Sequence, residues 1–333
     1  MMASAALGSY AQVADDEILK IQVNARLDYQ RDWDDWHTVK DNSGFEGKFL
    51  NFRIDGRIVP GLTYSWRQRL NKEHADRTFF DATDWVYLNW DFGRWSLSGG
   101  KEVVKIGGWE YDRAPIDIYS GSVFWNNIPC YEIGASLGYK ITENDKLSFQ
   151  FCESPFYTKQ NRDMYAYNLM WNGKHGIFHA LYSANLFQIT DNRYISYISL
   201  GNKFSLDKFD IELDYINRAA AHQTYFFKDC TVVGEVAYMP TERWRIHAKF
   251  SYDVNKTNSD ADYTVLPGTE LKMVGGGVEF YPLRTRKHQL RLHANMFYSW
   301  GHNANANDIM HNKSAIVSVG VRWDMDLFTL RRN

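Results

Sequence analysis

Basic side chains in several stretches of this chain are separated by an even number of positions, a spacing that could build a charged wall. Ten of them fall on the polar parity of alternating stretches: Lys20, Arg26, Arg53, Arg57, Arg67, Arg69, Arg245, Lys249, Arg291 and Arg322. Fixed charges along a narrow aqueous path select ions by sign, and low-dielectric walls strengthen their field. Asp28 and Asp55 interrupt the set, so a simpler interpretation is cross-strand ion pairing that only solvates the wall.

The residue patterns of catalytic and metal sites are not found. The 10 histidines share no ligand spacing, and Cys130, Cys152 and Cys230 form neither a metal nor a disulfide pattern. There is no Gly-rich phosphate loop and no G-x-S-x-G. The net charge of −2 gives no reason to expect nucleic acid. We predict no enzymatic activity, cofactor, metal or nucleic-acid partner. A barrel hydrolase whose nucleophile and base show no recognisable sequence motif is the alternative.

The elements that would carry the basic set are β-strands with one apolar and one polar face. In residues 19–30, LKIQVNARLDYQ, apolar and polar residues alternate strictly, which puts each kind on its own face of a strand. The pattern returns sixteen times after residue 17: 18–30, 49–58, 62–70, 83–90, 94–101, 130–140, 146–153, 163–171, 177–187, 194–204, 208–217, 230–238, 243–253, 272–281, 287–300 and 314–325. The even number is that of bacterial single-chain barrels.

The connections between these strands predict the same architecture. Seven short turns alternate with eight longer links, one of them 188–193, as in barrels with short turns at one end and loops at the other. We expect both termini at the short-turn end. Lipid would solvate the apolar face, and closure would pair every backbone group. The polar parity would then turn Arg26, Arg53, Arg57, Arg67 and Arg69 toward the lumen.

Composition agrees with a membrane barrel. Aromatic residues make up 16% of the 333 residues, and Trp and Tyr favour the water–lipid interface. Mean hydropathy is −0.48, and without an apolar run of about 18 residues a transmembrane helix is excluded. Residues 1–12 look like the remnant of a signal peptide, without its basic start; a flexible terminus is the alternative. Residues 13–333 then form one outer-membrane β-barrel.

The longest link, 102–129, has a composition that favours an ordered structure. Gly107 and Gly108 permit tight folding, and Trp109, Tyr111 and Ile116 can pack. Structureless loops longer than about 15 residues are usually functional. We expect residues 103–120 to enter the barrel as a constriction loop, whose charged residues are Lys105, Glu110, Asp112, Arg113 and Asp117. An outer loop that touches neighbouring molecules is the alternative.

Residues 49–140 are similar to the phosphate-selective porin O/P family of outer-membrane channels. The similarity rests on these residues: Arg53, Gly56-Arg57, Tyr64, Arg67, Asp84-Trp85-Val86-Tyr87-Leu88-Asn89-Trp90, Trp95-Ser96-Leu97, Gly99-Gly100-Lys101 and the loop. It implies a sixteen-stranded homotrimer with the third loop inside each pore and anion passage along basic residues. The loop acids Glu110, Asp112 and Asp117 depart from a phosphate site, which would need converging Arg, Lys and backbone donors.

These observations predict an all-β protein, a sixteen-stranded antiparallel transmembrane β-barrel with a long third loop folded into the lumen. We expect an outer-membrane porin in the bacterial cell outer membrane, in contact with its lipid. It would let small hydrophilic solutes diffuse passively, with weak anion selectivity. A structural or docking barrel with a plugged pore, part of an outer-membrane assembly, is the alternative. A soluble glycan-binding sandwich is a third interpretation.

Overall fold

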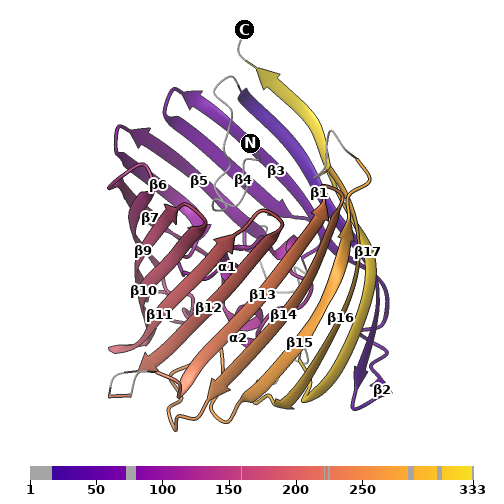
Figure 1. Ribbon diagram of the computed structural model, residues 1–333. Helices are drawn as coiled ribbons and strands as arrows, with labels where there is room; N and C mark the ends of the chain where they lie inside the picture. Colours follow the sequence, from indigo (N-terminus) through magenta and orange to yellow (C-terminus); the bar gives the residue numbers. More distant parts are fainter. Residues whose placement is uncertain are drawn as a thin grey trace.

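The computed structural model describes residues 17–72, 80–158, 160–220, 222–223, 226–283, 289–305 and 310–331. One antiparallel sheet of 17 strands dominates this part of the chain. The two-residue β2 only extends the turn after β1, so 17 − 1 leaves sixteen full strands. Strand β17 pairs with β1, which pairs with β3, so the sheet closes into a ring (Figure 1). The predicted sixteen-stranded antiparallel barrel is confirmed.

All sixteen predicted strands are present, with shifted ends. The strands are β1 Glu17–Asp34, β2 His37–Thr38, β3 Gly44–Val59, β4 Leu62–Arg69, β5 Thr83–Phe92, β6 Trp95–Val103, β7 Tyr131–Lys140, β8 Asp145–Glu153, β9 Tyr165–His175, β10 Phe178–Thr190, β11 Arg193–Ser205, β12 Phe209–Ala220, β13 Asp229–Thr241, β14 Trp244–Asn255, β15 Glu270–Phe280, β16 Leu290–His302 and β17 Lys313–Arg331. Between β6 and β7 lie α1 Trp109–Asp112, η1 Pro115–Asp117 and α2 Val123–Asn127. No helix within the described ranges is long and apolar enough to cross a membrane.

One predicted loop is a tight turn instead. The link expected over 188–193 shrinks to Asp191 and Asn192, because β10 runs to Thr190 and β11 begins at Arg193. Asn192 has a φ of 56°, and Asn adopts this left-handed backbone conformation more readily than most residues. The alternation of short and long links therefore fails at this connection.

Both ends of the described chain lie at the short-turn end of the ring. Glu17 pairs with Arg331, and Leu19 pairs with Gly56, close to the tight turn between β3 and β4. Gly61 in that turn has a φ of 82°, where a side chain would be strained. The expected placement of the termini is thereby confirmed for residues 17–331. The predicted signal remnant, 1–12, lies outside the described residues.

The strands expose their apolar faces and bury their polar faces, which is the reverse of the arrangement in a soluble protein. On β12, Phe209, Ile211 and Leu213 are 42%, 37% and 50% exposed. On β14, His247 and Lys249 are buried, and they stand on the face opposite to that of the exposed apolar residues of this strand. A polar interior with an apolar outer belt is the arrangement of a barrel whose solvent is lipid.

Aromatic pairs on neighbouring strands mark the short-turn end of the outer surface. Trp95 and Tyr139 face each other on β6 and β7, with ring centroids 4.6 Å apart. Trp244 and Phe280 do the same on β14 and β15, also at 4.6 Å. Such pairs suit the boundary between lipid and water, because aromatic rings favour the membrane interface.

A buried apolar cluster packs against the inner parity of β8–β12, β15 and β16. Phe124 of α2 contacts Tyr197 of β11, which contacts Phe187 of β10. The links after β8 and β14 add Phe156 and Val265 among others. The described cluster includes no residue of β1, β3 or β4, the strands that carry the arginines. One side of the ring is therefore apolar inside, and the other side is charged.

Candidate functional site

The predicted basic residues of β1, β3 and β4 lie on the inner parity of their strands, and Arg26, Arg53 and Arg67 each contact a carboxylate. Arg26 is buried, donates to Asp28 through Nε and Nη2, and donates through Nη1 to the carbonyls of Ile116 and Ile118 at 3.2 and 2.7 Å. Strand β1 thereby holds the segment around η1. Arg57 shares its parity with Arg53, two residues before it on β3.

Arg53, Arg67 and Arg69 form a group with two acids. Arg53 lies 2.7 Å from Asp55, and Asp84 of β5 lies 2.9 Å from Arg67 and 3.8 Å from Arg69. Asp84 was not anticipated as this shared counter-ion. The feature of the sequence that could have indicated this role is the position of Asp84 on the strand next to β4.

Basic residues across the closure of the ring pair with acids as well. Lys20 lies 3.5 Å from Asp326 at the rim. Arg245 contacts Glu235 at 2.6 Å and Glu279 at 3.5 Å. Glu279 was missed in the sequence, although it stands on a strand beside both Arg245 and Arg291.

Residues 104–130 carry charges that complement the strands they contact. Glu110 accepts from Lys249 at 2.6 Å. Asp117 accepts from Arg291 at 2.8 Å and from Arg322 at 2.5 Å.

The basic residue of the segment, Arg113, has the opposite arrangement. It donates to Glu212 at 2.5 Å and to Glu235 at 2.6 Å. Loop acids therefore meet strand cations, and the loop arginine meets strand acids.

Two strand aspartates cap the short helices of the segment. Asp214 of β12 accepts from the backbone N–H of Trp109 and Glu110, at 2.9 and 2.8 Å. Asp253 of β14 accepts from the N–H of Val123 and Phe124, at 3.0 and 3.2 Å. The first N–H groups of a helix have no partner within it and favour negative charge. Neither capping role was predicted, because a cap supplied by another strand leaves no local pattern.

The environment shifts the pKa values of the loop acids in opposite directions. Burial alone would raise the pKa of Asp117, but the adjacent Arg322 and Arg291 lower it to about 2. Burial, aided by Glu212, raises the pKa of Asp112 to about 6. Asp117 is thus a permanent charge, whereas Asp112 titrates close to neutral pH.

Lys105 takes a different place from the other predicted loop residues. Its side chain is buried, its N–H donates to Gln150, and its carbonyl accepts from Asn185. Burial lowers the pKa of this amine. Lys105 therefore belongs to the side of β8 and β10, away from the arginines of β3 and β4.

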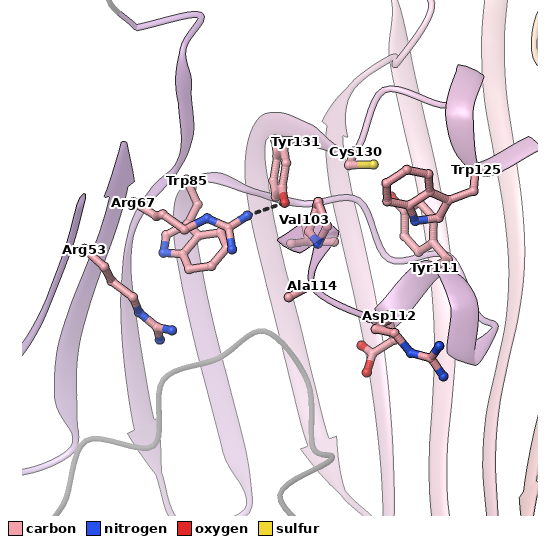
Figure 2. A pocket seen from close by; sticks show the side chains of 12 residues that line it. Arg53, Arg67, Trp85, Val103, Tyr111, Asp112, Ala114, Trp125, Cys130 and Tyr131 are labelled. Atoms are coloured by element: carbon pink, nitrogen blue, oxygen red, sulfur yellow. Dashed lines mark hydrogen bonds between the residues drawn. The ribbon is translucent and has the colours of Figure 1, made fainter. Parts of the chain in front are cut away.

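A cavity of about 140 Å³ separates residues 104–130 from the arginine side of the ring. Arg53, Arg67 and Trp85 lie on one side of it, with Asp112 and Trp125 on the other (Figure 2). The Arg67 guanidinium lies 3.7 Å from the Trp85 ring centroid and donates to the Tyr131 hydroxyl at 2.5 Å. This cavity brings the predicted basic wall and the predicted loop to one place.

Residues 19–184 match the protein family described as phosphate-selective porin O and P. The chain belongs to this family of porins. The resemblance predicted from residues 49–140 is confirmed, and the match extends beyond them in both directions. No curated protein matches the porin in sequence.

Solved outer-membrane proteins share the fold of this porin. The outer membrane channel DcaP of Acinetobacter baumannii is 10% identical, with a TM-score of 0.66 over 96% of this chain and 100% of that one. Salmonella typhi OmpF, solved with daunomycin, is 12% identical, with a TM-score of 0.64 over 94% and 99%. Vibrio cholerae OmpT is 11% identical, with a TM-score of 0.63 over 94% and 99%. At such low identity these likenesses show the fold alone.

Family and fold together make this porin a channel of the bacterial outer membrane. They point to transport through a barrel rather than to catalysis. The prediction of an outer-membrane porin is confirmed at this level.

Proposed function

We propose that this porin is a passive diffusion channel for small hydrophilic solutes with a weak preference for anions. The supporting observation is which charges reach the solvent. Side chains of Arg53 and Arg69 are 23% and 22% exposed, whereas those of their partners Asp55 and Asp84 are 6% and 1% exposed. A passing ion meets guanidinium groups first, and paired carboxylates behind them keep the preference weak.

Residues 104–130 would form the constriction, folded into the lumen. Their hydrogen bonds with Arg26, Lys249, Asp253 and Arg322 support this role, because all four side chains stand on the polar parity of their strands. The predicted basic residues, from Lys20 to Arg322, would form the pore wall. We also propose a homotrimer, because OmpT of Vibrio cholerae has been solved in a trimer form.

A plugged structural barrel is the second candidate. The buried apolar cluster around Phe124, Phe187 and Tyr197 favours it, since such a cluster inside the ring would close part of the cross-section. In that case the remaining cavity beside Arg53 and Arg67 would not connect the two ends.

Conductance in a planar lipid bilayer tests these alternatives. A channel gives stepwise current in potassium chloride, whereas a plugged barrel gives none. Under a salt gradient we expect a reversal potential that indicates a weak preference of the channel for anions. Neutralising Arg53, Arg57 and Arg67 together to Gln should shift it toward cations.

The matched control replaces Arg162, Arg193 and Lys256 with Gln. These side chains are 63%, 48% and 58% exposed, in loops or, for Arg193, at the start of β11, so the same charge is removed away from the inner face. An equal shift in both triple variants, or none in either, would contradict the proposed wall.

A further inference from the structure

Four aromatic rings line the cavity beside Arg53. Trp85 of β5 and Tyr131 of β7 contribute from the strands, and Tyr111 and Trp125 contribute from α1 and α2 (Figure 2). Val103, Ala114 and Pro115 add hydrocarbon. An aqueous path through a porin has no need of such rings, since small ions gain little from apolar surface.

The guanidinium groups of Arg53 and Arg67 are held in orientations that suit a planar anionic group. Arg67 stacks on Trp85 and is held by Asp84 through Nε and by Tyr131 through Nη2. Arg53 meets Asp55 at Nε, and its guanidinium carbon lies 5.4 Å from the Trp85 ring centroid. A guanidinium held by one edge presents its other nitrogens in a fork that matches a carboxylate.

We propose that this cavity is a binding subsite for aromatic carboxylates. The ring of the solute would lie among Trp85, Tyr131 and Trp125, and its carboxylate would contact Arg53. This proposal rests on the proposed function, because the solute reaches the subsite through the channel.

The size of the cavity agrees with one aromatic ring. Its volume is about 140 Å³, and apolar cavities of about 150 Å³ bind benzene. Offset or edge-to-face contacts with the cavity rings would stabilise the bound ring beyond the effect of burial.

Inorganic phosphate fits the same lining poorly. A tetrahedral oxyanion is stabilised by charged donors that converge from several directions. Here Arg53 and Arg67 stand on one side, whereas Tyr111, Asp112 and Trp125 stand on the other. Arg113 also lines the cavity, but its guanidinium is already bound by Glu212 and Glu235. The carboxylate of Asp112 would repel the far side of a phosphate, but it would meet only the ring of an aromatic monocarboxylate.

Block of the current by added anions tests the subsite. Sodium benzoate, acetate and phosphate are added to the purified porin in a planar bilayer with potassium chloride, and the half-blocking concentrations are compared. We expect benzoate to act at a concentration about tenfold lower than acetate, equivalent to about 1.4 kcal/mol. Phosphate should resemble acetate. Equal half-blocking concentrations for benzoate and acetate would overturn the proposal.

Two Trp variants locate the effect. Trp125→Ala removes one wall of the cavity and should abolish the advantage of benzoate. Trp36→Ala removes a ring that is 74% exposed and stacks on Tyr298 of the outer surface, so the advantage should persist. Correct folding of both is checked by the heat-dependent mobility of the barrel in gel electrophoresis.

Calorimetric titration separates failure of the subsite from failure of the channel. If the porin carries no current, the proposed function fails, but benzoate binding to the detergent-solubilised protein can still be measured. Heat of binding that Trp125→Ala removes and Trp36→Ala retains supports the subsite. A current in potassium chloride without benzoate binding overturns the subsite alone.

Discussion

Arg113 donates a hydrogen bond of 2.6 Å to Glu235, and 122 residues of chain separate the two. Four residues after Arg113, Asp117 contacts Arg291 and Arg322. Ion pairs of opposite polarity at Arg113 and at Asp117 therefore hold one short piece of chain, which admits a single orientation between the strands. Reversing the piece would bring like charges together.

Replacing Arg113 with Gln should loosen this piece. Glu212 and Glu235 would each lose Arg113 and keep only Lys203 and Arg245, respectively, and a hydrogen bond to a charged group contributes about 1.5–3 kcal/mol. We expect an equal loss of unfolding free energy in urea and noisier single-channel currents. Arg193→Gln, which breaks an exposed pair with Asp260, should change neither quantity. Single-channel currents of Arg113→Gln without added noise would contradict the anchoring role.

Replacing Asp253 with Ala should destabilise the docking of α2. The N–H groups of Val123 and Phe124 would lose their acceptor, and a buried polar group left without a partner costs about 1–3 kcal/mol. Thermal unfolding in detergent measures the loss. Asp253→Asn should retain part of the stability, because the amide oxygen still accepts a hydrogen bond. Asp91→Ala, at the exposed end of β5, is the control, and an equal loss there would count against the capping role.

Acidification through the pKa of Asp112 should strengthen the preference for anions. Burial and Glu212 raise this pKa to about 6, against the opposing effect of Lys105, Lys203 and Arg113. Above this pH the carboxylate is charged and repels anions, whereas below it the group is neutral. Reversal potentials at about pH 5 and about pH 7.5 measure the change.

The variant Asp112→Asn isolates this titration. At about pH 7.5 it should match the selectivity of the unaltered porin at about pH 5, because the amide carries no charge. Its own selectivity should change little between the two values. Selectivity of Asp112→Asn that still rises on acidification would assign the titration to another group.

Single cysteines on neighbouring positions of β3 should differ in their reaction with a charged thiol reagent. The three native cysteines are first replaced by Ser. Arg53→Cys should react and reduce the current, because residue 53 borders the cavity. Ile54→Cys should stay unmodified, since adjacent strand residues point to opposite faces and this one would meet lipid. Modification of both to the same extent would contradict the register of β3.

The sequence by itself determined the number of strands and, where apolar and polar residues alternate strictly, the face each residue occupies. Alternation with a period of two is a local property, so Arg53 and Ile54 are assigned to opposite faces without knowledge of any partner. Lipid outside the ring makes the assignment strict, because a one-residue shift would move every charge of a strand into hydrocarbon. Resemblance over residues 49–140 was likewise enough to indicate the family.

The tertiary structure alone decided which charges meet and which helix ends are capped. Arg322 and Asp117 are 205 residues apart, and Asp253 caps a helix 129–130 residues before it. The apolar cluster also joins separate links, such as those carrying Phe156 and Val265. Such contacts depend on which strands face each other across the closed ring, and no local periodicity encodes that distance. Even the turn at Asp191 and Asn192 followed from the pairing of β10 with β11, which extended both strands beyond their alternating residues.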